Sequence, residues 1–214
     1  MNVGKIMTHN PFTVTTDTPV TDAQALMSRE KIHRLPVLDK QKNLVGIVAE
    51  TDLLKAAPSE ATTLNMYEMF NLLSQLTVKD VMTKTVHSVT EDTLIEDAAR
   101  MLVDYDIGGV PVVRGPKVVG IVTESDIFKL FIELFGTRRR GIRATSLIPD
   151  QRAEIAHITA ALFERGGNII SIGTFPGDDP TNAVCIIKAD EISREDMVAA
   201  LKPFVIEVLD IRET

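Results

Sequence analysis

A short motif that combines hydroxyl and carboxylate side chains occurs twice in the sequence. It reads GIVAETD at residues 46–52 and GIVTESD at residues 120–126. A helix that begins at Glu124 would present free backbone N–H groups and a positive dipole end, which suit a phosphate group. Thr123 and Ser125 would add hydroxyl donors, and Asp126 would add a hydrogen-bond acceptor. The motif therefore predicts a site for a small, phosphate-bearing ligand.

The same residue types also have a purely structural interpretation, because Ser, Thr and Asp are common at the N-caps of helices. One copy alone would not distinguish helix capping from ligand binding, whereas two copies in one register favour binding. The copies also differ. Ala49 replaces the threonine in the first copy, while Thr51 and Asp52 remain, so the first site lacks one hydroxyl group.

The two motifs belong to a longer internal repeat. Residues 3–39 match residues 78–114 at an offset of 75, and residues 44–55 match residues 118–129 at an offset of 74. Matches spread over the whole unit with one small deletion indicate a duplicated domain rather than a chance likeness. We therefore expect both halves to have the same fold.

Each copy predicts the same βαββα order: an extended segment, a helix, two apolar strands and a second helix. Thr18-Pro19 and Asp92-Thr93 are expected to cap the first helices. The strands are nearly all apolar, as expected of strands buried on both faces. They are expected at residues 35–39, 44–49, 110–114 and 118–123, with turns at 39–43 and 115–116 and extended segments at 12–14 and 87–89.

Composition excludes several classes of protein. The net charge is −7 and the longest basic tract is Arg138–Arg140, which argues against a nucleic-acid partner. The single cysteine, Cys185, allows no internal disulfide, which is typical of proteins of the reducing cytosol. The start of the sequence has no apolar signal core. We therefore expect a cytoplasmic protein without a membrane partner. The four histidines fit no catalytic or metal-binding motif, which argues against an enzyme.

The repeat resembles a tandem pair of CBS domains, known as a Bateman module. The resemblance rests on the MTxxxxTV segment at residues 7–14, on the strands within HRLPVLD (33–39) and GGVPVVR (108–114), and on the two GIVxE[TS]D motifs. It implies a regulatory module whose clefts bind adenosine-containing ligands: AMP, ADP, ATP or S-adenosylmethionine. These are regulatory ligands, and no prosthetic group is expected.

The resemblance also implies roles for particular residues. Asp126 would accept hydrogen bonds from the ribose hydroxyls, and Thr123 and Ser125 would face the phosphates. The implied nucleotide-binding set further contains Thr13, His33, Arg34, Thr51, Asp52, Ser88, Val89, Ile107 and Pro111. Of these, Val89, Ile107 and Pro111 would flank the adenine ring. In AMP-sensing members a His-Arg pair at residues 33–34 faces phosphate, although a solvated surface pair is an equally good interpretation.

The pattern changes beyond Gly136. Strands at residues 141–150, 168–175, 182–190 and 205–213, with helices at 152–166 and after Ser193, give the βαββαβ order of the ferredoxin-like arrangement. This part resembles an ACT domain, which implies edge-to-edge pairing and amino-acid binding. Arg152-Ala153 stands where the family has Pro-Gly, and this departure argues against amino-acid binding. Cys185 is expected to be a buried, inert thiol.

The α/β (α+β) chain is therefore expected to contain a CBS domain at residues 1–60, a linker helix at 61–77, a second CBS domain at 78–136 and an ACT-like domain at 141–214. This order resembles the acetoin-utilisation regulator B-like proteins of bacteria. The expected function is a homodimeric sensor of an adenine ligand that regulates an unidentified protein. The alternatives are a dimeric scaffold with degenerate pockets and an amino-acid sensor that acts through the ACT-like domain.

Overall fold

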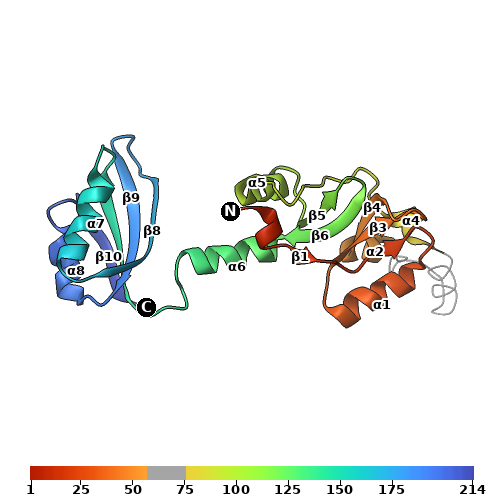
Figure 1. Ribbon diagram of the computed structural model, residues 1–214, viewed down its shortest axis with the longest axis horizontal. Coiled ribbons are helices and arrows are strands. Elements are labelled where there is room, and N and C mark those ends of the chain that lie inside the picture. Colours follow the sequence, from red (N-terminus) through yellow and green to blue (C-terminus); the bar gives the residue numbers. More distant parts are fainter. Residues whose placement is uncertain (57–75) are drawn as a thin grey trace, which may run out of the picture. The chain divides into compact units, whose positions relative to one another are not determined.

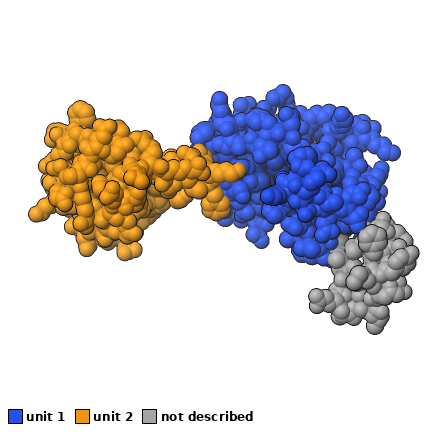
Figure 2. All heavy atoms as spheres, turned by 90° about the horizontal axis from the view of Figure 1, so that it is seen from below, with its two compact units in different colours: residues 1–127 blue, residues 128–214 orange. Residues whose placement is uncertain are grey.

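The computed structural model describes residues 1–56 and 76–214, and Figure 1 shows its helices and strands. The chain divides into two compact units, residues 1–127 and residues 128–214, which Figure 2 colours separately. Almost all of the linker helix expected at residues 61–77 falls outside the described residues. Within the described ranges, every helix is too short or too polar to cross a membrane.

The first unit contains both copies of the repeat, up to Ile127 in the last helix, and each copy has the predicted helix, two strands and second helix in that order. Each copy also begins with a short helical turn that the sequence did not predict, and the extended segment expected at residues 87–89 forms only an isolated bridge at Val89. The first copy consists of the 3-10 helix η1 (Val3–Lys5), β1 (Thr8–His9), β2 (Val14–Thr15), α1 (Val20–Glu30), β3 (Arg34–Leu38), β4 (Leu44–Ala49) and α2 (Glu50–Ala56). The second consists of α4 (Val78–Val81), α5 (Ile95–Asp104), β5 (Gly109–Arg114), β6 (Lys117–Thr123) and α6 (Glu124–Leu134). The four apolar strands and the two motif helices predicted from the sequence are confirmed.

The two copies exchange their opening segments. Strand β1, from the start of the first copy, pairs with β6 of the second copy and completes a sheet of order β1-β6-β5. In the opposite direction, Thr83 forms a bridge with Ile47 of β4, beside the β2-β3-β4 sheet. The cores follow the same exchange, because Val3 packs with the second copy and Val78 with the first.

The predicted caps of the first helix in each copy are wrong. Pro19 and Leu94, whose side chains cannot accept a hydrogen bond, occupy the N-cap positions of α1 and α5. The threonine hydroxyls instead close the preceding turn. Thr18 Oγ1 accepts from the Thr15 N–H at 3.0 Å, and Thr93 Oγ1 accepts from the Thr90 N–H at the same distance. Thr18 and Thr93 come too early in the chain to reach the first helical N–H groups.

The second unit has the predicted βαββαβ order. It consists of β7 (Ile142–Pro149), α7 (Glu154–Glu164), β8 (Asn168–Pro176), β9 (Asn182–Asp190), α8 (Arg194–Leu201) and β10 (Glu207–Glu213). The strands form one antiparallel sheet of order β10-β7-β9-β8, with α7 and α8 on one face (Figure 1). Ser193 caps α8 as predicted, by accepting from the Asp196 N–H at 3.0 Å.

Alternate side chains of the sheet pack against the two helices. Cys185 and Ile187 of β9 lie in this core with Leu162 and Met197. Cys185 is 2% exposed, and this burial raises the pKa of its thiol. The expectation of a buried thiol is therefore confirmed.

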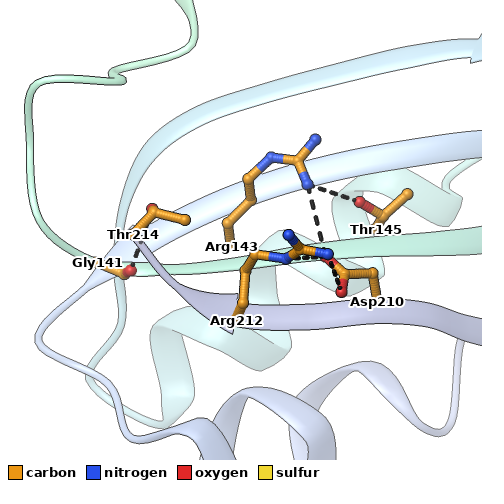
Figure 3. Close-up of polar contacts among 6 residues, drawn as sticks. All are labelled: Gly141, Arg143, Thr145, Asp210, Arg212 and Thr214. Atoms are coloured by element: carbon orange, nitrogen blue, oxygen red, sulfur yellow. Dashed lines mark hydrogen bonds and ion pairs between the residues drawn. The ribbon is translucent and has the colours of Figure 1, made fainter.

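The other face of the sheet makes polar contacts. Lys188 is buried and donates to the Gly136 carbonyl at 3.1 Å. Figure 3 shows β7 and β10, the first and last strands of this unit. Arg212 of β10 forms a two-point hydrogen bond with the Asp210 carboxylate, and the guanidinium of Arg143, on β7, lies 3.8 Å from the same carboxylate. The hydrogen bonds from Arg212 hold the pKa of Asp210 below its usual value. Gly141 and Thr214 exchange backbone hydrogen bonds beside this pair of strands.

The turn before α7 contains a strained residue. Ala153 is the N-cap of α7 and has a φ of 70°, in the left-handed region that favours glycine. It lies within the Arg152-Ala153 departure noted in the sequence. A Cβ in this conformation costs conformational energy that glycine avoids.

We therefore expect Ala153→Gly to raise the free energy of unfolding by about 0.5–1 kcal/mol, because it removes this strain. Ala160→Gly, at an exposed position inside α7, is the matched control and should lower stability by about 1 kcal/mol. Urea denaturation of both variants measures the difference. A loss of stability in Ala153→Gly equal to that of the control would contradict this account.

Candidate functional site

A cavity of about 240 Å³ lies between the two copies of the repeat, within the first unit. Both copies contribute to its walls. It is lined by Arg34, Ile47, Ala49, Thr51 and Asp52 of the first copy and by Thr83, Thr85, Val86, His87, Asp106, Ile107, Gly108 and Gly109 of the second. The walls combine apolar side chains with hydroxyl and charged groups, a mixture typical of small-molecule sites.

The junction of β4 and α2 positions the first wall. Asp52 is the third residue of α2, and its carboxylate accepts a hydrogen bond from the Ala49 N–H at 2.9 Å. This bond is half of a capping box. It holds the carboxylate at the start of the helix, where Thr51 also lines the cavity.

The exchanged segment of the second copy, Thr83 and residues 85–87, also lines the cavity. Reciprocal backbone hydrogen bonds between Thr83 and Ile47, at 2.9 and 3.0 Å, hold this segment against β4. The rings of His87 and Tyr105 stack with their centroids 3.8 Å apart. Our sequence reasoning did not identify residues 83–87 as site residues. The repeat offers one signal, because Phe12 stands at the position that matches His87 and is also aromatic.

Arg34 crosses from the first copy to the second. Its guanidinium donates a hydrogen bond to the Gly108 carbonyl, and a Cβ at Gly108 would overlap that guanidinium. Burial lowers the pKa of Arg34, while the nearby Glu124 carboxylate opposes this shift. The side chain is therefore a partly buried cation at the edge of the cavity.

The second-copy motif has a similar local geometry, but Asp126 lies outside this cavity. Asp126 is buried, and its carboxylate accepts from the Thr123 N–H at 3.0 Å and from the Thr123 hydroxyl at 2.8 Å. Ser125 is exposed on the first turn of α6. Both motif aspartates thus cap their helices, which is the structural role that the sequence also predicted for them. Capping is compatible with ligand binding by the same carboxylate.

The remaining candidates from the sequence are dispersed. Ile107 lines the cavity, whereas Val89 and Pro111 are buried in the second copy. Ser88 lines a separate hollow of about 250 Å³, and Thr13 is half-buried next to β2. The structure therefore brings together Arg34, Thr51, Asp52 and Ile107.

His33 lies apart from Arg34 in its contacts. Its Nδ1 is 2.7 Å from a carboxylate oxygen of Glu50, and the His33 side chain is largely exposed whereas that of Glu50 is about half exposed. His33 and Arg34 are adjacent in the sequence but contact different groups, because neighbouring side chains of an extended segment point in opposite directions.

These features agree with the family assignment. A model of the CBS domain matches residues 3–59 and 78–133, which is more than half of the chain. The chain belongs to the CBS domain family, and it contains the domain as a tandem pair. The model match does not extend over residues 134–214.

Several known proteins are similar to the pair. A Methanocaldococcus jannaschii protein is 39% identical over 136 residues, which is 62% of this chain and 32% of that protein. The chain thus matches about a third of the length of that relative. The structure of the acetoin utilization protein AcuB from Vibrio cholerae has a TM-score of 0.54 at 30% identity and covers 64% of this chain and 95% of its own.

Two similar structures contain ligands. The CBS domain pair of protein MJ0100, in complex with 5′-methylthioadenosine and S-adenosyl-L-methionine, has a TM-score of 0.52 at 30% identity, over 65% of this chain and 98% of its own. CBSX2 in complex with AMP has a TM-score of 0.53 at 33% identity, over 62% of this chain and 97% of its own. Both of these similar CBS pairs therefore bind adenosine compounds.

The two motif aspartates should differ in their contribution to stability. Asp126→Ala should lower the free energy of unfolding by about 1–3 kcal/mol, because the partly buried N–H and hydroxyl of Thr123 lose their acceptor. Asp52→Ala should cost about 0.5–2 kcal/mol, since Asp52 is less buried and Ala49 provides no hydroxyl. Urea denaturation without ligand compares the two variants. A larger loss in Asp52→Ala would contradict the hydrogen-bond assignment.

Proposed function

We propose that this chain is a regulatory protein that binds an adenosine-containing ligand, AMP, ADP, ATP or S-adenosylmethionine, in the cavity beside Asp52. One observation carries the proposal: Asp52, whose carboxylate is fixed by a backbone hydrogen bond, lines the same cavity as hydroxyl and apolar groups of the other copy. The fixed carboxylate suits a pair of ribose hydroxyls, which need an acceptor in a defined position. The ligands of the similar CBS pairs support this ligand class.

The lining residues suggest how such a ligand would lie. Asp52 would accept from the ribose hydroxyls, and Val86 and Ile107 would contact the faces of the base. His87 offers a further surface for stacking. Arg34 would reach an anionic group by leaving the Gly108 carbonyl.

The signal would pass through a change in conformation or assembly rather than through catalysis. Among the described residues, no group of three or more His, Cys, Asp or Glu side chains is placed to hold a metal ion. A ligand in this cavity contacts both copies, so it can favour one arrangement of the pair over another through its differential affinity. We propose that this change regulates a partner protein of a homodimeric chain.

For the second unit we propose an ACT-like domain that serves association. A hollow of about 490 Å³ in this unit is lined by Asp150, Asp178 and Asp179, and Lys and Arg are missing from its described lining. An amino acid brings an ammonium group, which these carboxylates would attract, and a carboxylate, for which the described lining offers no cation. The hollow therefore lacks a charged partner for one end of an amino acid, and we propose the association role for this unit.

A thermal-shift titration tests the proposed ligand class. AMP, adenosine or S-adenosylmethionine should raise the melting temperature of the wild-type chain in a saturable manner. Asp52→Ala should weaken the binding of that ligand about tenfold or more, because two hydroxyl groups lose their acceptor. Asp92→Ala, at an exposed position of the same unit, is the control and should bind as the wild type does. A wild-type chain that responds to no adenine compound would contradict the proposal and favour the scaffold alternative.

A further inference from the structure

The exchange of opening segments places one methionine of each copy against a glycine of the other copy. The Cγ and Cε atoms of Met82 lie 3.1 and 3.3 Å from the position that a Cβ of Gly46 would take, and the sulfur lies closer still. Met7, the repeat-mate of Met82, contacts Gly120 in the same way, at 3.0 and 3.2 Å. Each contact therefore brings a thioether sulfur directly against backbone.

The two contacts differ in their exposure and in the pairing that follows them. Met7 is 6% exposed, and the strand β1 that follows it pairs with β6 over two residues. Met82 is only half-buried, and beyond it the chain forms an isolated bridge between Thr83 and Ile47. Residues 83–85 are exposed. The second contact should therefore open to solvent more readily than the first.

Met82 also lies next to the wall of the cavity. Thr83 and Ile47 follow Met82 and Gly46 in the chain, exchange backbone hydrogen bonds at 2.9 and 3.0 Å, and both line the cavity. The side chain of Met82 packs against the apolar core of the first copy. A displacement of this side chain would therefore disturb the segment that brings residues 85–87 to the cavity.

A thioether at a partly exposed position can be oxidised by a peroxide. The sulfur lone pair attacks one peroxide oxygen, the O–O bond breaks, and methionine sulfoxide forms while hydrogen peroxide is reduced to water. At Met82 the new polar oxygen would lie against Gly46, which leaves no room for it, or in the apolar core, where burial without a hydrogen bond is costly. The oxidised side chain would therefore leave its place between the copies.

We propose that Met82 is an oxidation site through which a peroxide lowers the affinity of the CBS pair for its adenosine ligand. The proposal rests on the adenosine-binding function proposed above and adds a regulation of that site. Burial protects the equivalent Met7, so the response belongs to one of the two exchanged segments. A ligand that contacts both copies holds the segment closed and should slow the oxidation of Met82.

Treatment with dilute hydrogen peroxide, followed by peptide mass spectrometry and calorimetric titration with AMP, tests this proposal. The wild-type chain should be oxidised at Met82 before Met7, and its affinity for AMP should fall about fivefold or more. Methionine sulfoxide reductase should restore the affinity, because it converts the sulfoxide back to the thioether.

Two leucine variants separate Met82 from the other methionines. Met82→Leu keeps an apolar side chain without an oxidisable sulfur, so its affinity for AMP should stay within about twofold of the untreated wild type before and after peroxide. This variant keeps every other methionine, so it also measures any effect of their oxidation. Met7→Leu changes the repeat-mate and is the matched control, which should remain as sensitive to peroxide as the wild type.

A measurement on the wild-type chain alone does not depend on the folding of a variant. Saturating AMP should slow the oxidation of Met82 and leave that of Met1, which is 62% exposed, unchanged. Equal oxidation rates of Met82 with and without AMP would overturn the proposal.

The outcomes separate this inference from the function on which it rests. If the untreated wild-type chain binds no adenine compound, the proposed function fails and the inference fails with it. If the untreated chain binds AMP and the chain oxidised at Met82 binds AMP equally well, only the inference is overturned. An equal loss of affinity in peroxide-treated Met82→Leu would also overturn it, because another methionine would then be responsible.

Discussion

The exchange of opening segments between the two copies is the constraint on which the rest of the first unit depends. Met7 packs on Gly120 of the second copy, and Met82 packs on Gly46 of the first, where any side chain would collide with the methionine sulfur. Val3 and Val78 are fully buried in the cores that they complete. Each such side chain contributes about 1.5–3 kcal/mol through burial. Neither copy can therefore leave the other without opening its own core. The same exchange brings Thr83 and residues 85–87 to the cavity that Asp52 also lines.

A duplication held together in this way brings equivalent positions close to each other, and the two copies cannot remain identical there. Arg34 and the Gly108-Gly109 pair show the consequence: a large side chain in one copy requires an empty position in the other. Ala49 and Thr123 differ in a related manner, since only Thr123 adds a hydroxyl contact to its aspartate. The two copies therefore differ in the positions that lie at and beside the cavity.

The sequence predicted the local elements well because their signals are local. The apolar strands β3 to β6, the turns between them and the helices that start at Glu50 and Glu124 follow from residue type and spacing. The caps of α1 and α5 were predicted wrongly, because a threonine near a helix start can close the preceding turn instead.

The contacts between residues distant in the chain could not be predicted in this way. They are the exchanged segments, the stacking of His87 on Tyr105 and the contact between Arg34 and Gly108. No local pattern specifies such contacts, so the candidate site was predicted only in part: Arg34, Thr51, Asp52 and Ile107 meet, whereas Val89 and Pro111 lie in the core.

A crystal structure of the chain grown with AMP would show which residues hold the ligand. We expect ribose hydroxyls within hydrogen-bond distance of the Asp52 carboxylate, the base against Val86 and Ile107, and the Arg34 guanidinium on the phosphate instead of on the Gly108 carbonyl. A nucleotide bound away from Asp52, or one bound at Asp52 while Arg34 still donates to Gly108, would contradict this expectation.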